Sequence, residues 1–303
     1  MSSATISPDR AHATGRLQDA ARGHPLRAFF LVTFAITWTY EIVVCGLFDL
    51  EAIQWTIPAT FGPAIAAVLV TRAVEGRAGV RSFLRRLILW RVDVRWYLFA
   101  LVALPAVVVA GYVFMPDAKQ NVDDGALVIA ATYASSLLIL TLLGGGQEEP
   151  GWRGFALPRM QDRFGPLKAS LVLGLIWGVW HLPLFVFLKD YDNADPGFVA
   201  TALMFVVFTA CYTVGLSVIF TWLVNHARQS ILLAMLAHGS VNAATNFAPA
   251  TALPLMVSFM AVGVLALVIA LATHGQLGYT EGQRSAPDRS KRGKRGLRVS
   301  AAS

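Results

Sequence analysis

Charged residues are scarce in this sequence, and cysteine is almost absent. Only 14% of the 303 residues are charged, whereas 56% are hydrophobic. This composition excludes an ordinary water-soluble globular chain and is typical of a helical protein that crosses a membrane several times. The two cysteines, Cys45 and Cys211, both lie in apolar runs, so no disulfide framework is predicted.

Several signals of known protease types and of secretion are also missing. The sequence contains no HExxH zinc motif, and no G-x-S-x-G surrounds Ser240. Tyr191-Asp192 resembles half of an aspartyl protease motif, but no second aspartate lies in an apolar run. Residues 1–27 lack the short apolar core and small-residue exit of a cleavable signal, so we expect the first apolar run to remain as an anchor.

Long apolar runs dominate the chain instead. A membrane-spanning helix needs about twenty apolar residues. Eight runs approach this length: residues 28–48, 53–71, 96–115, 126–146, 169–188, 198–224, 231–248 and 251–273. The second contains Pro58 and Pro63 and the seventh contains His238, so these two fit a span least well. The sequence predicts an all-α polytopic membrane protein, a bundle of about eight transmembrane helices at 28–273, between a disordered segment 1–27 and a basic tail 274–303.

The positions of the charges explain the net charge of +7 without nucleic-acid binding. If the N-terminus is cytoplasmic, 23 of the 25 Lys and Arg residues fall in cytoplasmic segments, and the outer loops keep Lys119 and Lys189. This bias follows the positive-inside rule and predicts an even number of spans with both termini in the cytoplasm. Basic segments at 80–95 and 284–298 could bind anionic lipid.

One polar stretch stands at the end of the fourth apolar run. It begins with three glycines and continues as Gln147-Glu148-Glu149-Pro150-Gly151-Trp152-Arg153. Ionisable groups at a membrane boundary are costly and usually functional. Pro150 disfavours helical geometry at the residue before it, so we expect a helix break at Glu149 and a short helix from Pro150.

Two later apolar runs each carry a histidine. Residues four apart share a helix face, so Trp177 and His181 form one polar face, and His238, Asn242 and Asn246 form another. We expect these faces and the glutamates to converge on a polar cavity that opens toward the cytoplasm.

Such a cavity suits hydrolysis of a peptide bond. A carboxylate can act as general base on water, and imidazole and amide groups can stabilise the oxyanion. Alternatively, Glu148, His181 and His238 could hold Zn²⁺. Spacing alone leaves both possibilities open.

The two adjacent glutamates are not equivalent. Neighbouring helical residues point about 100° apart, so both cannot face the histidines in a regular helix. We expect Glu148 to face the cavity water, and Glu149 to pair with Arg153 or to support the groups around Glu148.

Together these motifs resemble a known family. E-E-x-x-x-R at Glu148–Arg153, an aromatic-x-x-x-H at Trp177–His181 and H-x-x-x-N at His238–Asn242 are similar to the three motifs of the CAAX prenyl protease and bacteriocin-processing (CPBP, Abi) family. The similarity is centred on residues 126–248. Where this chain has Trp177, the family more often has phenylalanine.

The resemblance implies an intramembrane endopeptidase of the metalloprotease-like CAAX type. It implies that Glu148 activates water with help from His181, that His238 and Asn242 form the oxyanion hole, and that Glu149 and Arg153 support them. The expected substrate is a membrane-associated protein or peptide, and the composition suggests a bacterial plasma membrane. The alternatives are a non-catalytic immunity or scaffold protein and a proton-coupled transporter; the absence of an internal repeat weakens the latter.

Overall fold

The computed structural model describes residues 18–48, 53–113, 125–187, 197–247 and 252–280, and these residues are helical with no β-strand. The α-helices, in chain order, are α2 (Pro25–Glu41), α3 (Gly62–Leu87), α4 (Val94–Leu98), α5 (Leu104–Ala110), α6 (Ala126–Leu143), α7 (Leu157–Phe164), α8 (Pro166–Trp180), α9 (Leu182–Phe187), α10 (Gly197–Val207), α11 (Val214–His226), α12 (Ile231–Thr245) and α13 (Ala252–Ala272). Short 3₁₀ or π-helical segments extend them: Ile42–Leu47, Ile53–Phe61, Phe99–Ala103, Gly146–Glu148, Pro150–Ala156 and Phe208–Thr213.

The expected apolar runs all form helices, but their lengths differ. Within the described residues, 6 helical stretches are long and apolar enough to cross a membrane, and Val94–Ala110 and Ile231–Thr245 are shorter. The polytopic helical bundle is therefore confirmed. The second run is not a weak span, because it continues over Trp55–Leu87. The seventh is short, and it is the helix that carries His238.

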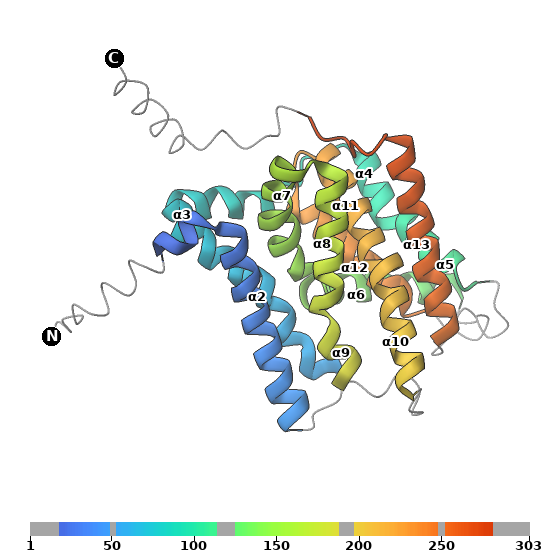
Figure 1. The fold of residues 1–303 in the computed structure, drawn as a ribbon. Helices are drawn as coiled ribbons and strands as arrows, with labels where there is room; N and C mark the ends of the chain where they lie inside the picture. Colours follow the sequence, from blue (N-terminus) through green and yellow to red (C-terminus); the bar gives the residue numbers. More distant parts are fainter. Residues whose placement is uncertain (1–17, 49–52, 114–124, 188–196, 248–251, 281–303) are drawn as a thin grey trace, which may run out of the picture.

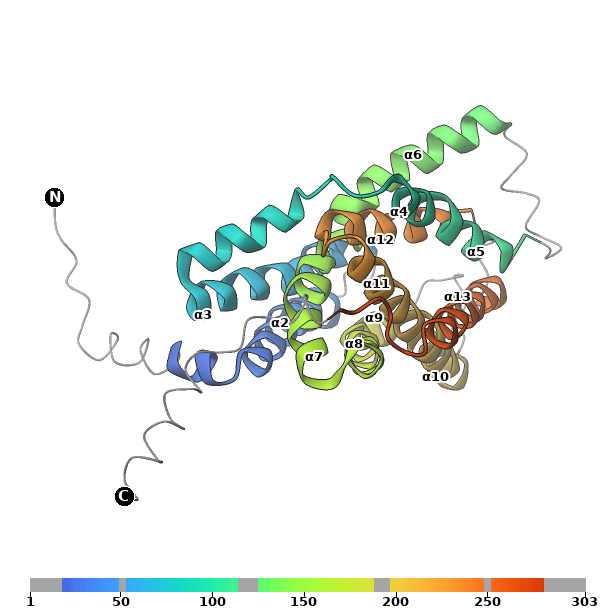
Figure 2. The same ribbon diagram turned by 90° about the horizontal axis from the view of Figure 1, so that it is seen from above.

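The helices form one bundle, and the described chain starts and finishes at the same end of it. In Figure 1, α2 begins and α13 finishes at the upper end of the view. This placement agrees with an even number of crossings. Figure 2 shows α6 reaching outward at the edge of the bundle. Only 6% of its most apolar window is buried, so most of its side chains are available to lipid.

Helix boundaries at the N-terminal end differ from expectation. Residues 18–23 are helical and α2 starts at Pro25, so only residues 1–17 of the expected disordered segment lie outside the described part. Helix α3 turns sharply at Gly76, whose φ of 70° suits glycine. The basic stretch 80–95 is helical up to Leu87 and again from Val94, where α4 begins. Most of the outer loops and of the tail 274–303 lie outside the described residues.

Glycines allow the helices that carry the site to approach closely. A Cβ at Gly174 of α8 would lie 2.5 Å from the Cα of Val214 on α11. A Cβ at Gly151 would collide with Pro63 of α3. In a membrane, where no hydrophobic effect drives helices together, such close packing is a main source of association. It fixes α8 and the Pro150–Ala156 segment relative to their neighbours.

Aromatic side chains fill the core behind the site. Phe29 of α2 stacks on Phe155 at 4.9 Å and meets Trp152 edge-on at 5.8 Å. All three are fully buried. The Trp38 indole donates to the carbonyl oxygen of Trp180 at 3.1 Å, which ties α2 to the end of α8.

Candidate functional site

The polar stretch starts where α6 stops, and the helix break lies earlier than expected. Gly144 and Gly145 leave helical geometry, with φ/ψ of −129/34° and 128/−39°. Glu149 has φ −61° and ψ −32°, so the expected break at Glu149 is wrong. The expected short helix from Pro150 is present as the Pro150–Ala156 segment, and Pro150 sits in its first turn, where a missing N–H costs no helical hydrogen bond.

Gly145 brings the backbone against α12. A Cβ on Gly145 would lie 2.5 Å from Nε2 of His238 and 2.7 Å from Nδ2 of Asn242. The Asn242 amide donates to the carbonyl oxygen of Gly144 at 2.5 Å. The loop therefore closes directly over the H-x-x-x-N face.

Replacing Gly145 by alanine should consequently disturb the site. We expect a loss of stability of about 2–3 kcal/mol from backbone strain and steric conflict, together with loss of activity. Gly165→Ala is the matched control, because Gly165 has φ +76° but nothing within 4 Å of its Cβ position. Thermal unfolding of both variants checks this. Equal effects would show that positive φ, and not contact with α12, requires the glycine.

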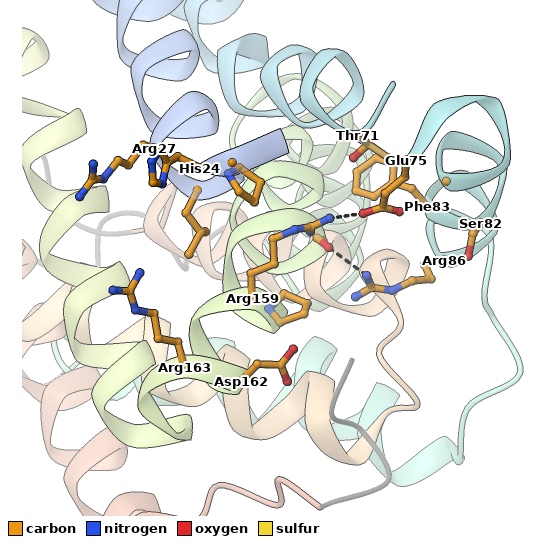
Figure 3. A pocket seen from close by; sticks show the side chains of 16 residues that line it. His24, Arg27, Thr71, Glu75, Ser82, Phe83, Arg86, Arg159, Asp162 and Arg163 are labelled. Atoms are coloured by element: carbon orange, nitrogen blue, oxygen red, sulfur yellow. Dashed lines mark hydrogen bonds and ion pairs between the residues drawn. The ribbon is translucent and has the colours of Figure 1, made fainter. Parts of the chain in front are cut away.

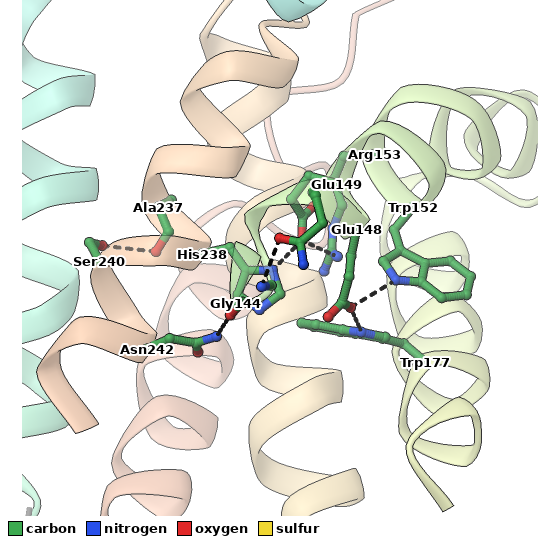
Figure 4. Close-up of polar contacts among 12 residues, drawn as sticks. Gly144, Glu148, Glu149, Trp152, Arg153, Trp177, Ala237, His238, Ser240 and Asn242 are labelled. Atoms are coloured by element: carbon green, nitrogen blue, oxygen red, sulfur yellow. Dashed lines mark hydrogen bonds and ion pairs between the residues drawn. The ribbon is translucent and has the colours of Figure 1, made fainter. Parts of the chain in front are cut away.

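The Glu148 carboxylate is held by two tryptophans (Figure 4). Its Oε2 accepts from the indole Nε1 of Trp177 at 2.8 Å and of Trp152 at 3.2 Å. The side chain is only 3% exposed. Two neutral donors satisfy one oxygen without a counter-charge, so the carboxylate is positioned but not neutralised.

The Glu149 carboxylate has different partners. Its Oε1 accepts from Nη1 of Arg153 at 3.0 Å, as expected, and lies 2.8 Å from Nδ1 of His238. The contact with His238 was not expected. All three groups are buried. The two adjacent glutamates thus serve separate networks, as their angular separation requires.

Arg153 completes the buried charge network. Burial lowers its pKa, and the nearby carboxylates of Glu149 and Glu148 oppose this change. Its guanidinium lies over the rings of Trp177 and Phe220, 4.5 and 4.8 Å from the centroids. Aromatic faces therefore supply much of the environment of this cation.

Trp177 of α8 connects the parts of the site. Its ring lies 5.3 Å from that of His238 and 5.7 Å from that of His181. The same indole donates to Glu148. The structure therefore brings together the motif residues of the polar stretch, α8 and α12 around one tryptophan.

His181 caps α8 and also packs among aromatic rings. Its Nδ1 lies 2.8 Å from the carbonyl oxygen of Trp177, which leaves Nε2 for other partners. On α12, Asn242 accepts from the Tyr212 hydroxyl at 3.2 Å. Asn246 does not join this face: it is exposed and donates to Ser136. The expected stripe on α12 therefore ends at Asn242.

A zinc site is not formed by these side chains as they are placed. Among the described residues, no group of three or more His, Cys, Asp or Glu side chains could hold a metal ion. His238 Nδ1 and Glu148 Oε2 already have protein partners. The suggested ligand set of Glu148, His181 and His238 does not fit a metal in this arrangement.

Some residues of the site were not identified from the sequence. Trp152 and Tyr212 supply donors to Glu148 and Asn242, and Gly145 shapes the loop. The spacing of four between Glu148 and Trp152 was an available signal. No sequence signal indicates Tyr212. Glu41 at the end of α2 is 3% exposed, and its Oε2 has no hydrogen-bond partner among the described residues.

Comparisons with known proteins match the part of the chain that carries the three motifs. A family model for the type II CAAX prenyl endopeptidase, Rce1-like, matches residues 130–244. CAAX prenyl protease 2 of Methanococcus maripaludis is 24% identical over an alignment of 239 residues, which covers 71% of this chain and 82% of that protein. The matched residues include all three motifs. These two similarities, centred on residues 130–244, therefore support the CAAX prenyl protease and bacteriocin-processing family for this chain.

Proposed function

We propose that this protein hydrolyses a peptide bond in a membrane-associated protein or peptide, with Glu148 as the general base. The observation that carries the proposal is the separation of the two glutamates. Glu148 is held by neutral indole donors, whereas Glu149 is paired with Arg153 and His238. Because Glu148 has no direct ion pair, its carboxylate is the one available to accept a proton from water.

In the proposed reaction, Glu148 takes a proton from a water molecule as the water oxygen attacks the scissile carbonyl carbon. The carbonyl π bond opens to an oxyanion. Collapse of the tetrahedral intermediate breaks the C–N bond, and protonated Glu148 returns the proton to the leaving amine. Proton transfer of this kind contributes about 10²–10⁴-fold to the rate. His181, with Nδ1 against its own helix, uses Nε2 to orient the water.

His238 and Asn242 are proposed to stabilise the oxyanion. Because Glu149 occupies Nδ1 of His238, Nε2 is the ring nitrogen left for the site. With a proton on Nε2, His238 can donate to the oxyanion. Asn242 has a second N–H beyond the one bound to Gly144. One well-placed donor to an oxyanion is worth about 3 kcal/mol.

The experiment compares peptide termini. Cells producing the wild-type chain should contain cleaved membrane peptides that are absent with Glu148→Gln/His181→Ala/His238→Ala, as measured by mass spectrometry of membrane fractions. The triple variant must show the same helical circular dichroism spectrum as the wild type. No difference in termini would contradict the enzyme and favour the alternative, a non-catalytic immunity or scaffold protein.

The chemical nature of the substrate needs a second comparison. The relative is named a prenyl protease, so the informative probe pair is a farnesylated C-a-a-X peptide and its unmodified form, with the purified chain in lipid. Equal cleavage of both supports a membrane peptide substrate without a prenyl requirement. Metal content of the purified wild type and triple variant then tests zinc assistance, because a metal bound at this site is lost with its ligands.

A further inference from the structure

A pocket of about 770 Å³ lies beside the site, at the end of the bundle where α2 and α8 begin. Its walls come from the start of α2, from both arms of α3 around Gly76, and from α7 (Figure 3). Gly154, directly after Arg153, also lines it, but Glu148, Glu149, His181 and His238 do not. It is therefore separate from the candidate active site.

Arginine is the main charged residue of this pocket. Four arginines line it, Arg27, Arg86, Arg159 and Arg163, against two carboxylates, Glu75 and Asp162. His24 adds an imidazole, and Leu26, Phe83 and Pro158 add apolar surface. A pocket with excess guanidinium groups and an apolar wall suits an amphiphilic anion.

Two of these arginines are used by the protein itself. Arg86 donates to the carbonyl oxygens of Gly154 at 2.9 Å and Gln229 at 3.0 Å. Arg159 pairs with Glu75 and donates to the carbonyl oxygen of Phe155. These contacts hold the walls of the pocket in place. They also occupy two of its four guanidinium groups.

Arg27 and Arg163 remain available. Both are exposed, and neither has a carboxylate partner within the described part of the chain. Arg163 lies only over the ring of its neighbour Phe164, at 5.2 Å. Figure 3 shows Arg27, His24 and Arg163 on the same side of the pocket. Two guanidinium groups without a carboxylate partner among the described residues therefore lie on the same side of the pocket.

The position of the pocket indicates the source of the anion. One candidate membrane span begins at Pro25, two residues before Arg27, and another begins at Pro166, three residues after Arg163. Arg27 thus lies in the first turn of one candidate span and Arg163 just before another, which places both at the level of lipid headgroups. An anion that lies at this depth and carries acyl chains is a phospholipid.

We propose that this pocket binds the phosphate headgroup of an anionic phospholipid, with Arg27 and Arg163 as its ligands. Arg86 and Arg159 shape the walls. This lipid site does not depend on the peptidase activity.

The test titrates the detergent-purified full chain with short-chain dioctanoyl phosphatidylglycerol and follows binding by isothermal calorimetry. Dioctanoyl phosphatidylcholine and inorganic phosphate are the other two arms. We expect phosphatidylglycerol to bind and the other two to bind at least about tenfold more weakly. Arg27→Gln/Arg163→Gln should weaken phosphatidylglycerol binding by about tenfold or more, since each basic residue contributes separately.

Two variants keep the result interpretable. Arg81→Gln/Arg85→Gln removes the same charge from exposed positions of α3 that do not line this pocket, and it should bind as the wild type does. Arg27→Lys/Arg163→Lys retains the charge and should restore most of the affinity. An equal loss of phosphatidylglycerol affinity in the Arg81/Arg85 control would show that binding depends on diffuse positive charge. That result would overturn the proposed site. Equal binding of inorganic phosphate would overturn the lipid assignment.

Discussion

Glu148→Gln should abolish peptide cleavage, with a fall in kcat of about 10³-fold or more. Glutamine keeps the shape and still accepts the indole hydrogen bonds of Trp152 and Trp177. It cannot take a proton from water. The variant should therefore fold normally, and its loss of activity should appear as a lower kcat. A peptide that is cleaved by the wild-type chain serves as substrate for the rate measurement.

Glu149→Gln is the informative partner of this variant. Glutamine at this position still accepts from His238 and Arg153 but no longer neutralises Arg153. We expect a smaller loss of activity together with a clear loss of stability. The control is Asp93→Asn, at the exposed N-cap of α4. It should change neither the activity nor the stability. If Glu148→Gln stays active while Glu149→Gln is inactive, the Glu149–His238 pair is the base. The proposed roles of Glu148 and Glu149 are then reversed.

Arg153→Met should have the largest effect on folding, a loss of about 3–5 kcal/mol in the free energy of unfolding. Arg153 and Glu149 are both fully buried and 3.0 Å apart. Removing the arginine leaves the Glu149 carboxylate inside the bundle with His238 as its remaining side-chain partner. Unfolding of the purified chain in mixed micelles measures the difference.

The double variant Arg153→Met/Glu149→Gln should recover most of that stability, to within about 1–2 kcal/mol of the wild type, because neither member of the ion pair stays buried without the other. Arg72→Met on α3 is the control, since Arg72 is exposed. Its effect should be within about 0.5 kcal/mol. A stable Arg153→Met variant would mean that the buried pair contributes little to folding.

The membrane architecture follows from the sequence because a bilayer imposes a simple rule. Every backbone polar group must be satisfied within a spanning segment, so long apolar runs become helices. The eight apolar runs and the helices that they form therefore agree. The motif residues could also be found, because so few polar groups occur in apolar runs that those present are conspicuous.

The sequence did not predict the local backbone geometry of the polar stretch. The break in the polar stretch was placed at Glu149 because proline disfavours helix before it. The structure puts the break at Gly145, whose positive φ and contact with His238 result from packing against α12. Once the glycines turn the chain, Pro150 starts a new segment, and Glu149 stays helical.

By itself, the sequence determined a polytopic helical membrane protein and the three polar motifs, since hydropathy and spacing are properties of the chain. Only the tertiary structure decided which glutamate receives which partner. Glu149 meets His238 across 89 residues, and Trp177 meets Glu148 across 29. Such contacts depend on how the 3₁₀ and π-helical turns rotate each side chain and on how closely glycines let the helices pack. The arginine pocket, assembled from α2, α3 and α7, arises from the same long-range packing.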